Sequence, residues 1–303
     1  MTQTLFSMQV GRKLEVHEYG DPSGHPAFFF HGLIGSHHQA SYVDQAARRA
    51  GIRVIAPNRP GVGRSEFVAR STPLDAAADI EVLARTLGLG AFSVIGLSGG
   101  TPYAMAVLRR FSDRVQTATI LSGMGPSALP GALRGMDPRR RLILAIGARR
   151  TAMARQFFEK SESRFRESPE TFLDRLIRTW SAPDREMFRR PEVYNLFMKD
   201  LEEVFSNPNA TESLAQELAI YRWRGLSPHD LPAGHRVTLW HGLSDNIVPP
   251  SMAWAMVRSL PNAEAHLLPG GHFLAIDAAG AIIAWLVEQL GSSRDGAGRP
   301  SHR

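Results

Sequence analysis

Residues 91–111, AFSVIGLSGGTPYAMAVLRRF, combine a short apolar run, a G-x-S-x-G pentapeptide and a run with helical character. Residues 91–95 predict a buried strand, and residues 101–111 predict a helix. A sharp turn between them forces Ser98 into a strained backbone conformation, which requires small neighbours two positions away on either side. The N–H groups at the start of the helix favour developing negative charge at the same place. The stretch therefore predicts that Ser98 is a nucleophile.

Two further residues complete a Ser, Asp, His set in chain order. Residues 237–240 predict a strand that leads into a loop holding Asp245. Residues 265–268 predict the next strand, followed by a glycine-rich loop that ends in His272. Asp245 has a second interpretation, because aspartate also caps helices and a helix is predicted at about residues 251–260. The order of the three residues on alternating strands and helices nevertheless favours a catalytic triad.

The chain resembles the α/β-hydrolase superfamily over roughly residues 14–290. Besides the serine pentapeptide and the Gly-Gly-His loop, the resemblance rests on His31-Gly32 after an apolar strand. It also rests on residues 58–65, NRPGVGRS, which are similar to the D-x-P-G-x-G-x-S loop of that family, with Asn58 where aspartate is common. In the superfamily the triad acid can also lie after the strand that here ends near Leu121. Residues 122–125 offer no carboxylate at that position, which favours Asp245 as the triad acid.

The resemblance assigns a role to each of these residues. His272 would remove the proton of Ser98 and later return one to the leaving group, while Asp245 fixes the imidazole tautomer. The oxyanion hole would consist of the backbone N–H groups of Leu33 and Gly99. The short loop after His31-Gly32 suggests acyl groups of modest size.

The order of elements predicts an α/β fold, the α/β-hydrolase fold, with a mostly parallel central sheet flanked by helices and an inserted helical cap. The predicted strands are residues 27–30, 53–56, 92–96, 116–121, 237–240 and 265–268, after a hairpin at 4–19. The predicted core helices are 40–50, 74–87 and 101–111, and the predicted cap helices are 139–160, 170–180, 191–205 and 211–223. We therefore expect a core domain of residues 1–126 and 233–290, a cap of residues 127–232 and a disordered tail of residues 291–303.

Four residues are candidates for lining the substrate pocket: His31, His37, Phe157 and Trp180. Each has an alternative interpretation. His31 can serve the geometry of its loop, and His37 can be an exposed polar loop residue. Phe157 and Trp180 lie in helical runs, where aromatic residues usually form the core of the protein.

Residues 134–155 hold seven arginines (residues 134, 139, 140, 141, 149, 150 and 155) against one acid, Asp137. One interpretation is a solvated cap helix with its apolar side inward. The other is that the cluster attracts an anionic substrate or an acidic carrier protein near the mouth of the pocket.

Composition excludes several classes of protein. Of 303 residues, 43% are hydrophobic and 21% are charged, as in an ordinary globular enzyme. The absence of cysteine excludes disulfides and thiolate metal sites.

The net charge of +6 comes mainly from arginine, but no nucleic-acid motif accompanies it, so we expect no nucleic-acid partner. No segment has the length of a membrane span and the N-terminus lacks a signal-peptide pattern, so we expect a cytoplasmic protein without integral membrane association. The eleven histidines form no spaced ligand set beyond the adjacent His37 and His38, and neither a metal nor a cofactor is predicted.

The sequence therefore predicts a serine hydrolase that cleaves a small-molecule carboxylic ester or lactone. A thioesterase, amidase, C–C hydrolase, acyltransferase or perhydrolase would use the same triad, because the pocket rather than the nucleophile selects the substrate. Dehalogenases and epoxide hydrolases are disfavoured, since those relatives place aspartate where Ser98 stands. A ligand-binding receptor on the same fold is the alternative from a different class.

Overall fold

The computed structural model describes residues 2–8, 11–69, 72–147, 149 and 151–296. Within these residues the centre is an eight-stranded sheet in the order β1-β2-β4-β3-β5-β6-β7-β8. The strands are β1 (Thr2–Ser7), β2 (Lys13–Gly20), β3 (His25–Phe30), β4 (Ile52–Pro57), β5 (Phe92–Leu97), β6 (Val115–Leu121), β7 (Val237–Gly242) and β8 (Ala263–Leu268). β1 and β2 form an antiparallel hairpin, β2 is antiparallel to β4, and the other pairs are parallel. The predicted hairpin and the mostly parallel sheet are both confirmed.

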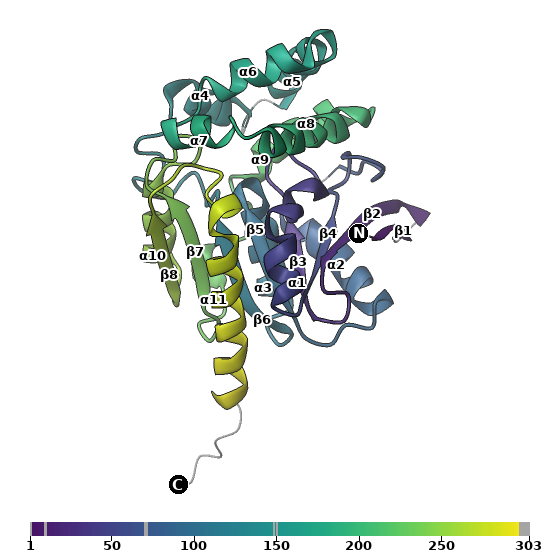
Figure 1. Ribbon diagram of the computed structural model, residues 1–303, viewed down its shortest axis with the longest axis vertical. Helices are drawn as coiled ribbons and strands as arrows, with labels where there is room; N and C mark the ends of the chain where they lie inside the picture. Colours follow the sequence, from purple (N-terminus) through teal and green to yellow (C-terminus); the bar gives the residue numbers. More distant parts are fainter. Residues whose placement is uncertain (1, 9–10, 70–71, 148, 150, 297–303) are drawn as a thin grey trace.

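Helices cover both faces of the sheet. Every residue of β5 and β7 is buried, as expected for parallel strands with apolar layers on each side. One face packs against α2 (Leu74–Thr86), α3 (Thr101–Arg110) and α10 (Pro250–Ser259). The other packs against the 3₁₀ helix η2 (His37–Val43), α1 (Asp44–Arg49) and α11 (Ala275–Gly296), and α1 and α11 lie in front of the sheet in Figure 1.

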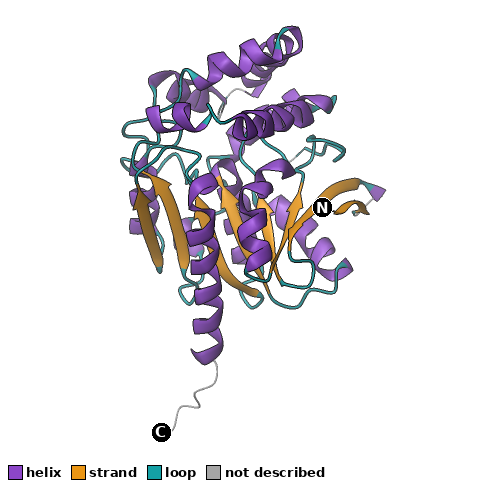
Figure 2. Ribbon diagram, in the orientation of Figure 1, coloured by secondary structure: helices purple, strands orange, loops and turns teal. Residues whose placement is uncertain are grey.

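A set of helices, the helical insertion, separates β6 from β7 in the sequence. It consists of α4 (Pro138–Gly147), α5 (Thr151–Glu167), α6 (Pro169–Ile177), α7 (Ala182–Met187), α8 (Pro191–Ser206) and α9 (Ala210–Ile220). Figure 2 shows these helices stacked above one end of the sheet, the end at which β5 and β7 finish. The insertion therefore covers the loops that carry Ser98 and Asp245.

Aromatic side chains fasten the helical insertion to the sheet domain. Trp180, Phe188 and Phe197 of the insertion surround Phe273, with ring centroids 4.8, 4.8 and 5.6 Å from that of Phe273. All four rings are buried. Such edge-to-face and tilted pairs each contribute about 0.5–1.5 kcal/mol beyond the burial of apolar area. Because Phe273 follows His272 directly, this packing also fixes the loop of that histidine.

The structure departs from the predicted elements in three places. The run predicted at 139–160 is two helices, since α4 ends at Gly147 and α5 begins at Thr151. Gly147 packs closely on α9, where a Cβ would lie 2.3 Å from Leu218. The short helix α7 was not predicted. Residues 291–296 continue α11 instead of starting a disordered tail, since a helix anchored by buried residues propagates easily; residues 297–303 lie outside the described residues. None of the helices in the described part of the chain has both the length and the hydropathy needed to cross a membrane.

Candidate active site

The turn between β5 and α3 carries Ser98. Its φ is 50°, a left-handed conformation that residues other than glycine rarely adopt. The surrounding chain lies very close: a Cβ on Gly100 would be 2.0 Å from the carbonyl oxygen of Phe30, and a Cβ on Gly96 would be 3.0 Å from the Cβ of Ala104. The two glycines of the pentapeptide therefore permit the turn that places the Ser98 hydroxyl beyond the end of the sheet.

Three side chains from three loops meet at this turn. The Oγ of Ser98 lies 3.0 Å from Nε2 of His272, and Nδ1 of His272 lies 2.7 Å from Oδ2 of Asp245. A carboxylate only accepts hydrogen bonds, so Nδ1 carries the proton and Nε2 presents a lone pair to the serine hydroxyl. The structure thus brings together the three residues that the sequence predicts as a triad, in an arrangement that can transfer the Ser98 proton to His272.

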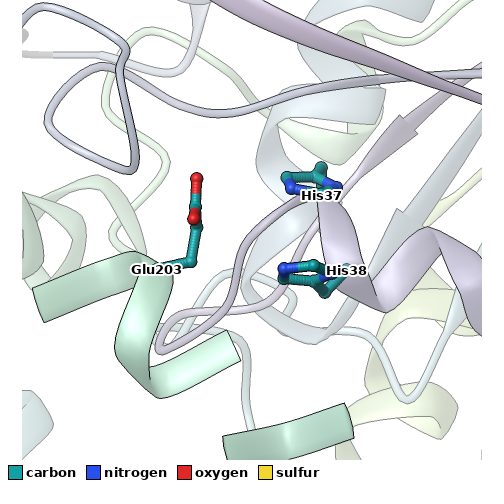
Figure 3. Close-up of side chains that lie close together, drawn as sticks. All are labelled: His37, His38 and Glu203. Carbon is teal, nitrogen blue, oxygen red and sulfur yellow. The ribbon is translucent and has the colours of Figure 1, made fainter. Parts of the chain in front are cut away.

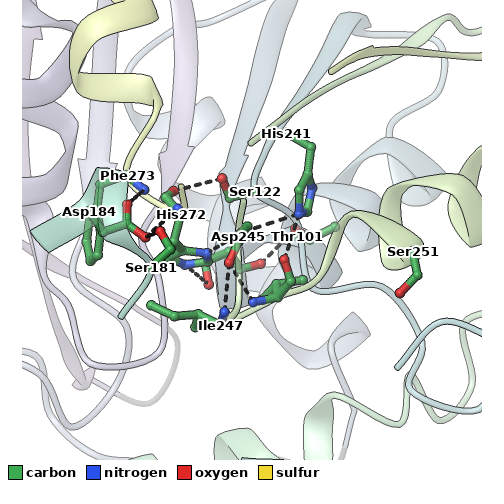
Figure 4. A network of polar contacts seen from close by, with 12 residues as sticks. Thr101, Ser122, Ser181, Asp184, His241, Asp245, Ile247, Ser251, His272 and Phe273 are labelled. Carbon is green, nitrogen blue, oxygen red and sulfur yellow. Dashed lines mark hydrogen bonds and ion pairs between the residues drawn. The ribbon is translucent and has the colours of Figure 1, made fainter. Parts of the chain in front are cut away.

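Asp245 remains ionised in a fully buried position. Its Oδ1 accepts hydrogen bonds from the backbone N–H groups of Ile247 and Val248, at 2.8 and 2.9 Å. His241 adds a further donor, since its Nε2 lies 2.8 Å from the Val248 carbonyl and 3.3 Å from Oδ2 of Asp245. Burial raises the pKa of Asp245, but electrostatic attraction to the His272 imidazole and the side-chain hydrogen bonds from His241 and His272 outweigh it and hold the pKa well below its usual range. Figure 4 shows this network.

The backbone of His272 is held from two sides. The hydroxyl of Ser122, at the end of β6, donates to the His272 carbonyl at 2.8 Å. From the helical insertion, the carboxylate of Asp184 accepts the N–H groups of His272 and Phe273, at 3.0 and 3.1 Å, and the hydroxyl of Ser181 at 2.6 Å (Figure 4). Asp184 is completely buried. The sequence does not predict this contact, because α7 carries no motif that indicates it.

Two backbone N–H groups lie beside Ser98. Gly99 lies in the first turn of its helix, where N–H groups have no partner inside the helix. A Cβ on Gly99 would be 3.0 Å from the nitrogen of Leu33, whose N–H has no acceptor among the described residues. The loop before Leu33 is fixed, since Gly32 donates to Gln39 at 2.7 Å and accepts from Arg59 at 2.7 Å. The two predicted oxyanion donors therefore lie next to each other and beside Ser98.

A cavity of about 150 Å³ opens above these groups. It lies between the loops at the end of the sheet and the helical insertion. Its lining residues are Gly32, Leu33, Ile34, Gln39, Leu97, Ser98, Arg140, Leu176, Trp180, Phe197, Ile247, His272 and Phe273. Cavities of this volume hold a molecule about the size of benzene. The site therefore accepts a small group in largely apolar surroundings.

Of the four predicted pocket residues, only Trp180 lines this cavity. His31 is completely buried behind it, with Nδ1 3.0 Å from the Gly32 carbonyl and Nε2 accepting the N–H of Arg59. His37 is bonded to the Tyr19 hydroxyl at 2.7 Å. Phe157 is 42% exposed on α5, because the opposite side of that helix packs inward. Assigning these three residues to the pocket was wrong: hydrophobic or polar character alone does not show which way a side chain faces.

The arginine cluster of residues 134–155 is not uniform. The exposed members are Arg134, Arg139, Arg141, Arg149 and Arg155, and Arg150 lies outside the described residues. Arg140 differs, because it is partly buried and lines the cavity with Ser98.

A second buried aspartate joins the helical insertion to the sheet domain. Oδ1 of Asp200, on α8, accepts the N–H of Ser36 at 2.8 Å and its hydroxyl at 2.5 Å, just before η2. Its Oδ2 is buried and has no hydrogen-bond partner in the described part of the chain. Burial raises the pKa of Asp200 to about 7, although the Ser36 hydrogen bonds oppose this.

One group of metal-ligand types occurs among the described residues. His37, His38 and Glu203 present ligand atoms that all lie within 4.8 Å of one another (Figure 3). The sequence does not indicate it, because Glu203 belongs to the distant helix α8. Asn58 already occupies part of this polar region, donating to Glu15 at 2.8 Å and to Glu203 at 3.2 Å. An aspartate in place of Asn58 would add a third carboxylate here, which gives a physical reason for the asparagine.

Comparison with known proteins agrees with this architecture. Residues 28–279 match the family model for the alpha/beta hydrolase fold. Similar solved structures include an esterase from Exiguobacterium antarcticum (16% identity, 96% of this chain and 100% of that chain, TM-score 0.68). Also similar is a thermophilic esterase from Thermogutta terrifontis (21% identity, 97% of this chain and 99% of that chain, TM-score 0.65). A third similar structure is the enol-lactonase from Burkholderia xenovorans LB400 (17% identity, 95% of this chain and 100% of that chain, TM-score 0.69). No curated protein matches the sequence. At these identities the solved structures show the fold alone, but the family model covers most of the chain, and the chain belongs to the alpha/beta-hydrolase family.

Proposed function

We propose that the protein is a serine hydrolase that cleaves a carboxylic ester or a lactone through an acyl-enzyme on Ser98. One observation carries the proposal: an unbroken series of contacts runs from the Ser98 hydroxyl through His272 to Asp245, at 3.0 and 2.7 Å. The strained turn at Ser98 supports it, because such a conformation persists mainly where the exposed hydroxyl is used.

The reaction follows from the roles of these groups. Oγ of Ser98 attacks the substrate carbonyl carbon while Nε2 of His272 accepts the hydroxyl proton. The N–H groups of Leu33 and Gly99 bind the resulting oxyanion, and loss of one such donor costs on the order of 3 kcal/mol in the transition state. His272 then protonates the leaving alkoxide. Water, deprotonated by His272, attacks the acyl-enzyme and releases the acid and free Ser98.

The helical insertion would act as a cap over this reaction. Trp180, Phe197 and Phe273 give the cavity apolar walls, which exclude water and strengthen the electrostatic interactions inside. The small cavity favours an acyl or alcohol group of about six non-hydrogen atoms. A thioesterase, amidase, C–C hydrolase, acyltransferase or perhydrolase would share the triad, and these activities differ from ester hydrolysis in substrate rather than in nucleophile.

Labelling with a fluorophosphonate, measured by intact mass, tests the proposal. We expect one adduct on the wild type and on the Ser23→Ala control, whose serine is exposed and distant in the fold, but none on Ser98→Ala. Hydrolysis of nitrophenyl esters of increasing acyl length should stop in Ser98→Ala and should fall in the wild type once the acyl group exceeds the cavity. Saturable ligand binding with neither adduct nor turnover would instead support a receptor on the same fold.

A further inference from the structure

Arg140 is the one residue with a permanent charge among the described residues that line the cavity. It lies in the first turn of α4, in the helical insertion, opposite the loop that carries Ser98. Gln39, another polar residue of the lining, already accepts a hydrogen bond from Gly32. The cavity therefore combines a nucleophile, apolar walls and a single guanidinium.

No protein carboxylate pairs with this guanidinium within the described residues. The acids close enough to act on its charge are Asp137, Asp184 and Asp245. Asp137 accepts backbone N–H groups of α4. Asp184 and Asp245 are bonded to the backbone and side chain of His272 and to neighbouring groups. These three acids are thus committed elsewhere.

The hydrogen-bonding capacity of Arg140 is also largely unused. Among the described residues its side chain makes one hydrogen bond, from Nη2 to the hydroxyl of Thr179 at 2.7 Å. A guanidinium has five N–H donors, and its planar edge fits the two oxygens of a carboxylate. Burial lowers the pKa of Arg140, with partial compensation from the nearby acids, yet arginine stays protonated in proteins. A partly buried cation without a partner is unfavourable unless a ligand supplies the opposite charge.

We propose that Arg140 binds a carboxylate of the substrate, so that the preferred ester or lactone carries a carboxylate a few atoms from the bond that is cleaved. This inference rests on the proposed hydrolase function. The volume of the cavity limits the group between the two ends to a short chain. Arg139 and Arg141 flank Arg140 on the same helix but are exposed, so they do not take part.

Matched substrates measure this preference. Monomethyl glutarate is compared with methyl glutaramate, in which a primary amide of the same shape replaces the carboxylate. Acetoxyacetate and acetoxyacetamide form a second pair, with the carboxylate on the alcohol side. We expect wild-type kcat/KM to favour the acid by about 10- to 100-fold in at least one pair, as for a charge-assisted hydrogen bond.

The variants separate binding from a structural role. In Arg140→Gln the acid-to-amide ratio should fall to about one, mainly through KM, while Arg140→Lys should retain part of it. Arg139→Gln and Arg141→Gln should keep the wild-type ratio. If Arg140 had only a structural role, holding α4 to Thr179, its replacement would change kcat/KM equally for the acid and the amide of a pair. The acid-to-amide ratio would then stay unchanged. An acid-to-amide ratio near one in the wild type, or one unchanged in Arg140→Gln, would overturn the inference while leaving ester hydrolysis itself intact.

A binding measurement is independent of turnover. In a Ser98→Ala background, glutarate should raise the melting temperature, and the shift should disappear with Arg140→Gln but not with Arg141→Gln. If the wild type shows no fluorophosphonate adduct and no ester turnover, the hydrolase function fails, and the glutarate shift still decides whether Arg140 binds a carboxylate. Equal shifts in the Arg140 and Arg141 variants would contradict it.

Discussion

The loops at the end of the sheet and the helical insertion contribute different things to the same site. The loops supply the groups of the proposed reaction, Ser98, Asp245 and His272, on chain ends held by strand pairing. The insertion supplies Asp184 and Arg140, which hold the histidine loop and line the cavity. We therefore expect the proposed chemistry to depend on the sheet domain, and its positioning and selectivity to depend on the insertion.

Two buried aspartates, one from each region, show this contrast at the level of a single carboxylate. Asp245 has backbone N–H groups and histidines around both oxygens, and its pKa is lowered. Asp200 has one oxygen without a partner, and its pKa is raised to about 7. Burial raises the pKa in both cases, and the sign of the shift differs because His272 and His241 attract the charge of Asp245, whereas Glu203 repels that of Asp200.

The largest effect is expected at Asp245. In Asp245→Asn the amide donates to His272, which places the imidazole proton on Nε2 and removes the acceptor for the Ser98 proton. The rate constant kcat should fall by about 10⁴-fold, equivalent to about 5.5 kcal/mol. Steady-state hydrolysis of a nitrophenyl ester measures this, with the exposed Asp174→Asn as control. A loss below tenfold would mean that Asp245 only caps the following turn.

The second effect concerns stability and pH at Asp200. Its pKa is raised on folding from about 3.8 to about 7, so the folded protein binds a proton more tightly than the unfolded chain. The tighter proton binding at Asp200 adds about 4 kcal/mol to the free energy of unfolding. This contribution is complete below about pH 4 and is lost as the pH rises to about 7. Urea unfolding measures this in the wild type and in Asp200→Asn. As the pH rises from about 4 to about 7, the free energy of unfolding of the variant should increase relative to that of the wild type. A constant difference from pH 4 to pH 8 would show that Asp200 is ionised throughout.

Removal of Asp184 should have a smaller effect on both stability and rate. Asp184→Ala leaves the buried N–H groups of His272 and Phe273 without an acceptor, at a cost of about 3 kcal/mol in unfolding free energy. We expect kcat to drop by about 10- to 100-fold with little change in KM, because the histidine loop loses its position. Asp184→Asn, which retains one acceptor oxygen, should recover part of kcat. Unchanged kcat in Asp184→Ala would confine the contact to stability.

The smallest effect is expected on the outer surface of the insertion. Arg155 is more than half exposed and pairs with Glu159 and Glu212 at 2.9 and 3.2 Å. Solvent-exposed ion pairs contribute little to folding stability. Arg155→Ala should therefore change the unfolding free energy by less than about 0.5 kcal/mol and leave kcat/KM unaltered. A larger change in kcat/KM would extend the active surface of the insertion beyond Arg140.

Sequence predicts the two regions unequally. Ser98, Asp245 and His272 each follow a recognisable strand, and parallel strands that end at one edge bring such residues together. Asp184 carries no such signal, since its partners lie 88 and 89 residues away in the chain. Arg140 is indistinguishable in sequence from Arg139 and Arg141, because only packing determines which of three consecutive arginines faces the cavity.

The buried contact between Arg59 and Glu217 limits how this molecule can be recombined. Arg59 follows β4, Glu217 belongs to α9, and their charged atoms lie 3.2 Å apart with almost no exposure. Glu217 also accepts a hydrogen bond from the Tyr103 hydroxyl. Replacing the helical insertion with a different one would leave the buried Arg59 guanidinium without its carboxylate partner, at a cost of about 3–5 kcal/mol. We therefore expect an exchange of helical insertions between relatives to succeed only when both residues of this ion pair are exchanged together.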